Sequence, residues 1–316
     1  METNPARTNR WAWAALAVPL AAVVELVAQQ VIQARVPTPA QWRAAAAYLR
    51  TAKQPGDLVT SAPLWTDPLA RQYFADVIPL ADAARPDATR YRRALVATIR
   101  GGENPDLRGW RETGHRDFGR ITVRTLANPH PATVRYDFVE NLHPPDAEVL
   151  RVVGDAPAPC QFRTGLPVAG GGLGGGALAG PSRYLCPAEG WNYVGPTIIE
   201  DMEHRGRRCL WSHPVQGGVM VTRFHDVPMG ATIHGHHGIA YEAERGDDFG
   251  NMGGPVELRV LVDGAEAGTS VHRDGEGWKT FDVDTRAWAG TSRTVTFEVR
   301  AADAGNRHYC FEGDAR

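Results

Sequence analysis

The chain has 316 residues, which is enough for two folded units of ordinary size. Hydrophobic residues make up 43% of it and charged residues 22%, a globular balance that excludes a disordered chain. The formal net charge of −2 lacks the basic excess of a general nucleic-acid-binding protein, so we expect no nucleic-acid partner.

The first predicted element is an apolar helix within residues 1–36. The segment from Trp11 to Ile32 holds one charged residue, Glu25, and at about 1.5 Å per residue it could cross a hydrocarbon layer of about 30 Å. We predict a retained transmembrane helix. A signal peptide cleaved after Ala28 and a buried helix of a soluble protein are the alternatives. Arginines flank the segment on both sides, so charge alone does not fix its orientation.

Residues 37–143 are predicted to form a small α/β domain. Thr38 has the side chain of a helix N-cap, Pro39 suits the first helical position, and an apolar stripe follows at helical spacing. Pro55 and Gly56 end this helix. Further elements are expected as a strand at 57–60, a helix at 67–76, a buried strand at 94–99 and alternating strands at 119–126 and 133–139.

Three short patterns follow the apolar helix, namely WRAAAAYL, PGDLV and APLW. Together they resemble the extracytoplasmic α/β domain of GT-C glycosyltransferases of the protein-mannosyl or aminoarabinose-transferase type. Those multi-span enzymes use lipid-linked sugar donors, and their catalytic acidic residue lies in a loop between early membrane helices. This sequence offers one candidate span, so the resemblance implies surroundings of envelope-glycan assembly and not transferase activity.

Residues 144–316, which begin within a candidate linker at 143–146, are predicted to form an antiparallel β-sandwich. Strands with alternating apolar residues are expected near 218–224, 256–262, 277–284, 294–300 and 308–311. The turns between them resemble those of jelly-roll carbohydrate-binding modules, which implies a jelly-roll-like fold. The glycine-rich stretch 165–180 lacks the Lys-Ser/Thr pair of a phosphate-binding loop, and we expect a surface loop there.

All four cysteines lie in this second half, at positions 160, 186, 209 and 310. None forms a CxxC pair, so a zinc knuckle is not expected, and an even number suits two disulfides in an oxidising compartment. Four free thiols are the alternative. Of the three possible pairings we predict Cys160 with Cys186 and Cys209 with Cys310. We therefore expect a single-pass membrane protein with its bulk on the periplasmic side.

Residues 229–248, MGATIHGHHGIAYEAERGDD, contain the densest cluster of histidines. On a strand, two of them point to one face and the third points to the other. Candidate ligands for a divalent ion are His225, His234, His236, Asp247 and Asp248. Hydrogen-bonded structural histidines and a solvated acidic loop are the alternatives. We expect no cofactor, and a structural calcium or zinc ion is the exception that these residues would allow.

Aromatic residues are the stronger indication of function. Flat rings can stack on sugar rings while nearby polar groups bind hydroxyls, in the way that small-molecule sites combine apolar and polar linings. The candidate ligand-binding residues are Trp191, Tyr193, Trp211, Trp288 and Asp201. Packing in a core is the alternative for each aromatic residue.

No catalytic residues are predicted, because the sequence contains no G-x-S-x-G motif or ordered nucleophile and base. We therefore expect a membrane-anchored cell-envelope protein with a non-catalytic binding or scaffolding role toward glycans or a glycan-assembly partner. The alternative is a metal- or carboxylate-dependent glycan hydrolase that uses the histidine-rich stretch 225–248.

Overall fold

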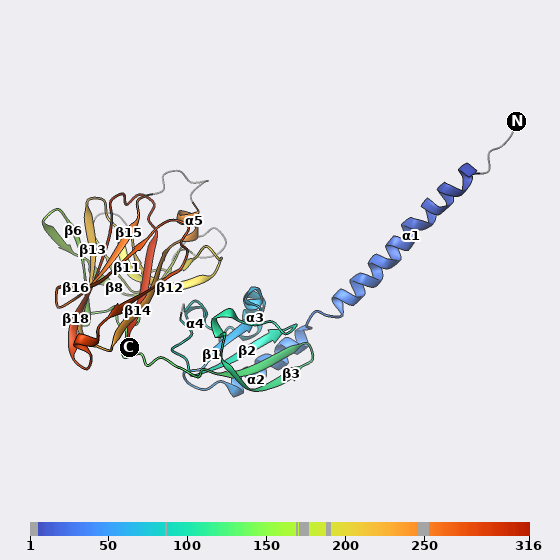
Figure 1. Cartoon of the computed structure of the whole chain (residues 1–316), viewed down its shortest axis with the longest axis horizontal. Helices are drawn as coiled ribbons and strands as arrows, with labels where there is room; N and C mark the ends of the chain where they lie inside the picture. Colours follow the sequence, from blue (N-terminus) through green and yellow to red (C-terminus); the bar gives the residue numbers. More distant parts are fainter. Residues whose placement is uncertain (1–5, 86, 169, 171–176, 188–190, 246–252) are drawn as a thin grey trace. The chain divides into compact units, whose positions relative to one another are not determined.

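The computed structural model describes residues 6–85, 87–168, 170, 177–187, 191–245 and 253–316. The chain divides into two compact units, which are coloured by sequence in Figure 1. The first comprises Met1–Ile78 and Arg93–Asn128, and the second comprises Pro79–Arg92 and Pro129–Arg316. The expected boundary was at residue 143, whereas this division assigns Pro79–Arg92 and the residues from Pro129 onward to the second unit. The predicted strand at 133–139 is reduced to β5 (Tyr136–Asp137), which pairs with β19 (Tyr309–Ala315) in the second unit.

Helix α1 (Ala6–Gln33) contains a segment, Ala15–Gln33, that is long and apolar enough to cross a membrane. Its described side chains are exposed, for example Leu20 at 66% and Leu26 at 59%, so no other described part of the chain covers them. A signal sequence near the N-terminus would have the same length and composition. Together with the two disulfides described below, this helix indicates an extracytoplasmic location.

Helix α2 (Pro39–Ala52) begins where the sequence predicted. Thr38 Oγ1 accepts a hydrogen bond from the Gln41 backbone N–H at 3.3 Å, and the Gln41 side chain accepts one from the Thr38 backbone N–H at 3.0 Å. This reciprocal capping box satisfies two N–H groups that a helix start would leave without partners. The predicted apolar stripe is buried, with Trp42 and Leu49 almost inaccessible to solvent.

The first unit is built on a four-stranded sheet of order β1-β2-β4-β3. Strands β1 (Leu58–Ala62) and β2 (Arg93–Ile99) are parallel, whereas β4 (Ile121–Ala127) is antiparallel to both β2 and β3 (Arg111–Phe118). Strand β3 was not predicted, because nearly all of it is exposed and it carries no apolar alternation. The unit also contains η1 (Leu64–Thr66), α3 (Asp67–Phe74) and η2 (Pro105–Leu107).

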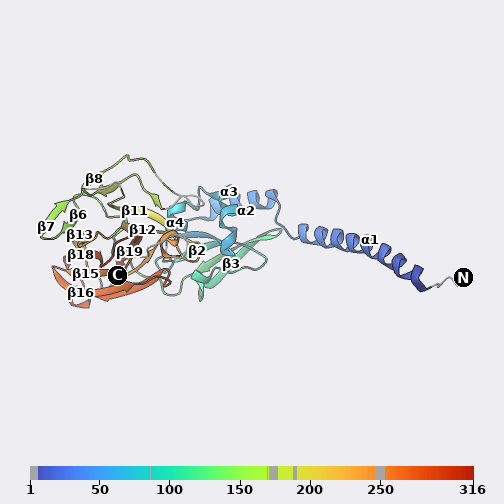
Figure 2. The ribbon, with the colours of Figure 1, turned by 90° about the horizontal axis from the view of Figure 1, so that it is seen from above.

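The second unit is a stack of two mainly antiparallel sheets, which Figure 2 shows from above. One sheet has the path β17-β14-β19-β12-β11-β10-β8, with β5 beside β19 and β9 beside β11, and the other has the order β16-β15-β18-β13-β6-β7. The elements of the first sheet are β8 (Gln161–Arg163), β9 (Leu178–Ala179), β10 (Arg183–Leu185), β11 (Tyr193–Glu200), β12 (Gly206–Ser212), β14 (Thr232–Ile239), β17 (Lys279–Asp284) and β19. Those of the second sheet are β6 (Ala147–Val153), β7 (Ala156–Pro159), β13 (Gly218–Pro228), β15 (Val256–Val262), β16 (Ala265–His272) and β18 (Ser292–Ala301). Short helices are α4 (Leu80–Ala83), α5 (Tyr241–Glu244) and η3 (Arg286–Trp288).

The core of the sandwich lies between these two sheets. Phe224 and Phe297 from one sheet and Phe311 from the other are all fully buried in it. Burial of a Phe side chain contributes roughly 1.5–3 kcal/mol. The inward positions Val256, Leu258, Val260 and Val262 of β15 alternate with exposed or half-buried neighbours, as predicted. The α+β prediction, with an apolar N-terminal helix and a β-rich second half, agrees with this architecture.

Both predicted disulfides are present. Cys160 is bonded to Cys186, and Cys209 of β12 is bonded to Cys310 of β19. The second bond joins strands that are already neighbours, because Trp211 of β12 pairs with Cys310 in the register. It therefore fixes the end of the sheet from which the loops described next emerge.

Candidate functional site

Loops of the sandwich unit surround a hollow of about 570 Å³, which we call the aromatic pocket. Its walls come from the turn before β11, the end of β12 with the loop after it, and the loop between β18 and β19. The lining residues are Trp191, Trp211, His213, Pro214, Gln216, Asp303, Ala304, Gly305, Asn306 and His308. The volume lies within the range of about 300–1,000 Å³ that is usual for small-molecule sites.

Two tryptophans form the aromatic part of the pocket. The Trp211 indole N–H donates a hydrogen bond to the Trp191 carbonyl oxygen at 3.2 Å, which ties the turn before β11 to β12. Behind Trp211, the Tyr193 ring stacks on it with centroids 5.7 Å apart. Trp211 is 6% exposed, whereas Trp191 is 45% exposed. Trp211 is therefore the fixed base of the wall, and Trp191 is the ring that remains accessible to a ligand.

Two histidines complete the wall between the tryptophans. The His213 ring centroid is 4.6 Å from that of Trp191, and the His308 ring centroid is 5.3 Å from that of Trp211. His213 Nδ1 lies 2.7 Å from the Pro214 carbonyl oxygen, so the ring N–H donates there and leaves Nε2 as an acceptor. Burial lowers the pKa of His213 to about 4, and the ring is therefore neutral at pH 7.

His308 is held from its other side. Its Nδ1 lies 3.7 Å from Glu242 Oε1. Interaction with His308 holds the pKa of the Glu242 carboxyl below its ordinary value, so this carboxylate is ionised at neutral pH. The His308 backbone carbonyl accepts a hydrogen bond from the Ala240 N–H at 2.9 Å, which holds His308 in place beside Trp211.

The polar side of the pocket is a short loop braced by Gln216. The Gln216 side chain donates to the Ala302 carbonyl at 2.9 Å and accepts from the Ala304 N–H at 2.9 Å. Asp303 Oδ1 accepts from the Gly305 N–H at 3.1 Å, and Asp303 is exposed. Asn306 has φ +50°, a left-handed conformation that asparagine tolerates better than most residues. The loop thus presents a carboxylate and an amide opposite the aromatic wall.

This arrangement can bind a polar molecule that has one flat apolar face. A ring stacked on Trp191 would place its substituents near the Asp303 carboxylate, the Asn306 amide and the His213 acceptor. Hydrolysis of a glycoside usually uses two carboxylates about 5–10 Å apart. Among the described residues, the lining of the aromatic pocket offers one carboxylate, that of Asp303.

The structure brings together two of the five predicted ligand-binding residues, Trp191 and Trp211. Tyr193 packs behind them and does not line the pocket. Trp288, in η3, packs against the sandwich core. Asp201 is 1% exposed, accepts from the backbone N–H groups of two following residues and forms a buried ion pair with Arg207. It holds a turn and lies outside the lining of the pocket.

The histidine-rich stretch forms β14, with the predicted side-chain alternation. His234 Nδ1 lies 2.7 Å from Asp282 Oδ1, and His236 Nδ1 lies 2.6 Å from Glu312 Oε1. The rings of these two histidines are 5.2 Å apart on one face. His237, on the opposite face, is fully buried, and its ring nitrogens are hydrogen-bonded to Tyr309 and Ser270 at 2.8 Å each.

The five predicted metal ligands divide between different places. His225 lies on β13, which belongs to the other sheet from β14. Asp247 and Asp248 lie outside the described residues. Among the described residues, no three His, Cys, Asp or Glu side chains are arranged to hold a metal ion.

Sequence reasoning missed His213, His308, Asp303 and Asn306. His213 follows Trp211 by two residues at a strand end, and His308 precedes Cys310 by two. Once the predicted Cys209–Cys310 disulfide places their strands side by side, the two histidines are expected near one sheet edge. That inference was available from the sequence, whereas the position of the Asp303–Asn306 loop was not.

Comparisons with known proteins identify no relative by sequence. No family model matches the chain. No curated protein matches it either. The resemblance to the transferase domain thus has no support beyond its residues.

Among solved structures, the chain is similar to the tandem CBM51 modules of Sp3GH98, the family 98 glycoside hydrolase from Streptococcus pneumoniae SP3-BS71. The TM-score is 0.31 at 9% identity, over 62% of this chain and 59% of that one. A secreted serine protease, VesC from Vibrio cholerae, matches with a TM-score of 0.23 at 10% identity, over 64% of this chain and 56% of that one. The chain therefore spans less than two thirds of either structure, and likenesses this low carry no argument about function.

Proposed function

We propose that the protein is a membrane-anchored component of the cell envelope that binds a glycan in the aromatic pocket without transforming it. The observation that carries this proposal is the exposed Trp191 ring beside the polar groups of Asp303, Asn306 and His213. A sugar ring has apolar C–H faces and hydroxyls at its edge, which match an aromatic surface next to hydrogen-bonding groups. The jelly-roll-like character that we assign to the sandwich fits this role.

Preorganisation supports the same conclusion. The Trp211 indole, the Gln216 side chain and the Cys209–Cys310 disulfide hold the three walls before any ligand arrives. A site whose side chains are already fixed loses less conformational entropy on binding. A neutral His213 also avoids placing a charge against the apolar face of a sugar.

The anchor forms the second part of the proposal. We assign α1 as a retained membrane helix, because its apolar surface is exposed and the two disulfides favour an oxidising compartment outside the cytoplasm. Extraction of native membranes at alkaline pH tests this assignment together with N-terminal sequencing of the mature protein. Retention in the membrane with an intact N-terminus is expected. A soluble form that begins near residue 29 would overturn the anchor but not the pocket.

The pocket is tested with the full chain, purified in a non-ionic detergent, on an array of envelope polysaccharide fragments and common oligosaccharides. We expect binding to a restricted set of glycans and its loss in Trp191→Ala. Trp65→Ala is the matched control, because Trp65 is 66% exposed on the other unit and lines no part of the pocket. Absence of glycan binding by the wild-type chain, or equal loss in both variants, would contradict the proposal.

A further inference from the structure

Three arginines gather at one end of the α/β unit. In the β2–β4 register Ile99 pairs with Ile121, so Arg100 directly after β2 and Arg120 directly before β4 lie at the same end of the sheet. Arg120 occupies the β3–β4 turn with Gly119, whose φ is +71°. This neighbourhood follows from strand pairing alone.

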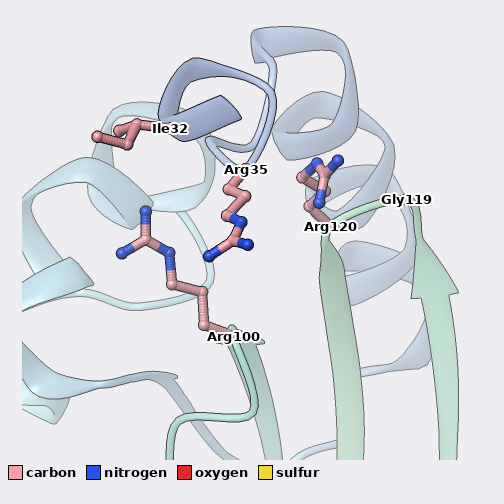
Figure 3. A pocket seen from close by; sticks show the side chains of 5 residues that line it. All are labelled: Ile32, Arg35, Arg100, Gly119 and Arg120. Atoms are coloured by element: carbon pink, nitrogen blue, oxygen red, sulfur yellow. The ribbon is translucent and has the colours of Figure 1, made fainter. Parts of the chain in front are cut away.

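The start of α2 lies at the same end. A Cβ atom on Gly119 would stand 2.1 Å from Gln41 Nε2, which shows how closely the turn approaches the capping box of α2. Arg35 precedes the capping residue Thr38 by three positions and follows the last residue of α1 by two. The end of the apolar helix, the start of α2 and the β3–β4 turn therefore meet here, as Figure 3 shows.

These segments enclose a hollow of about 540 Å³, which we call the arginine pocket. It is lined by Ile32, Arg35, Arg100, Gly119 and Arg120. Figure 3 shows the guanidinium groups of Arg35 and Arg100 turned toward the same space. All three arginines are exposed, and within the described residues none of them forms an ion pair or a side-chain hydrogen bond.

Several other arginines of the same unit form ion pairs. Arg50 pairs with Asp76, Arg71 with Asp67 and Arg93 with Asp57. Among the described residues, the lining of the arginine pocket contains no carboxylate, so three positive charges line one hollow without an acidic partner there. Guanidinium groups bind phosphate oxygens through paired hydrogen bonds, and such a cluster is suited to an anion.

The position of the arginine pocket indicates which kind of anion it would bind. The candidate span ends at Gln33, and two further residues of helix would carry Arg35 only about 3 Å beyond it. Phosphate groups of lipids lie at this depth, just outside the hydrocarbon layer, and juxtamembrane arginines are attracted to anionic lipids. Ile32 adds an apolar wall toward the membrane side, which a free phosphate ion would not use.

We propose that the arginine pocket binds the phosphate of an anionic phospholipid headgroup. This inference rests on the anchor part of the proposed function. It does not depend on the aromatic pocket. The phosphate of a bound lipid would compensate part of the positive charge of the three arginines and hold the α/β unit at the membrane surface.

The test measures binding of dioctanoyl phosphatidylglycerol to the full chain in a non-ionic detergent by isothermal titration calorimetry. We expect Arg35→Gln combined with Arg120→Gln to weaken binding about tenfold or more, as loss of two charge-assisted contacts implies. The matched control is Arg108→Gln with Arg111→Gln. It removes two exposed arginines of the same unit, and Arg111 pairs with Ala127 at the opposite end of the β3–β4 hairpin. This control should stay within about twofold of the wild type.

Two further probes distinguish the sources of the phosphate. Dioctanoyl phosphatidylcholine should bind much more weakly, and inorganic phosphate should not compete at equal concentration. Equal binding of phosphatidylcholine, equal weakening in both double variants, or competition by inorganic phosphate would overturn the lipid assignment. Alkaline extraction of the Arg35→Gln/Arg120→Gln protein from membranes should match the wild type, which separates failure of this site from failure of the anchor.

Discussion

Two places on the same sandwich carry paired histidines, and they differ in what surrounds the rings. On β14, the His234 and His236 rings face carboxylates of the neighbouring strands. In the aromatic pocket, the His213 and His308 rings face the indoles of Trp191 and Trp211. A histidine that is already bound by a carboxylate supports the fold, whereas one set in an aromatic wall leaves a surface for a ligand.

The difference originates in the sheet register. His234 pairs with Asp282 on β17, and His236 pairs with Glu312 on β19, so each ring meets a carboxylate directly across the strands. His213 and His308 lie beyond strand ends, in loops that have no register partner. Loops at the end of a rigid sandwich are common places for binding residues.

The largest expected effect concerns the rigidity of the pocket. Replacing Cys209 and Cys310 by serine opens a loop with a sequence separation of 101 residues. In chain-entropy models a bridge of that span contributes about 4.7 kcal/mol to the free energy of unfolding. The bridge between Cys160 and Cys186, with a separation of 26 residues, contributes less. Hydrogen exchange of β12 and β19 peptides in urea measures the loss. Equal losses for the two double-serine variants would contradict the special role of the bond beside Trp211.

The next effect is acid sensitivity, which originates in the pocket. The folded pKa of His213 is about 4, below the ordinary value of 6.5, so the unfolded chain binds a proton more readily and stability is lost as pH falls from 6.5 toward 4. Between pH 7 and pH 4.5 this group accounts for about 2 kcal/mol of lost stability. His213→Gln should reduce the acid-induced loss by that amount, measured by urea unfolding at both pH values. His143→Gln, which replaces a more exposed histidine, is the control. If His213→Gln left the acid-induced loss of stability unchanged, the account of His213 would be contradicted.

A smaller effect distinguishes the two histidines of β14. Burial raises the pKa of Glu312, and His236 is the partner that opposes this shift. His236→Ala should cost about 1–2 kcal/mol of stability, because it leaves a buried carboxyl group without its partner. His234→Ala should cost less than about 0.5 kcal/mol, because water can replace it at Asp282, whose side chain is 62% exposed. Urea unfolding compares the two variants, and equal costs would contradict this account of the pair.

Patterns that are local in the sequence predicted most of the fold. The Thr38 N-cap and the alternation in β15 followed from residue type and spacing, and the even number of cysteines predicted two disulfides. Strand β3 did not, because an exposed strand carries no apolar period. The pairing of β5 with β19 was not predicted either, because β5 has only two residues and its partner lies more than 170 positions later in the chain.

The site was predictable only in part, for a related reason. Trp191 and Trp211 were selected as aromatic residues of the β-rich half, Trp191 also for its place beside a turn, and both line the aromatic pocket. Asp201 was selected for its charge, yet its carboxylate is already bound by Arg207 and two backbone N–H groups. A sequence lists donors and acceptors, but which of them are already used depends on long-range pairing.

The most direct measurement compares the aromatic pocket with β14 in one titration. Calorimetry with the glycan that binds best on the array gives Kd for the wild type, Trp191→Ala and His234→Asn. We predict that Trp191→Ala raises Kd about tenfold or more, because an exposed aromatic anchor is lost, while His234→Asn stays within about twofold of the wild type. A Kd unchanged by Trp191→Ala but raised by His234→Asn would contradict the account and move the site to the histidine-rich strand.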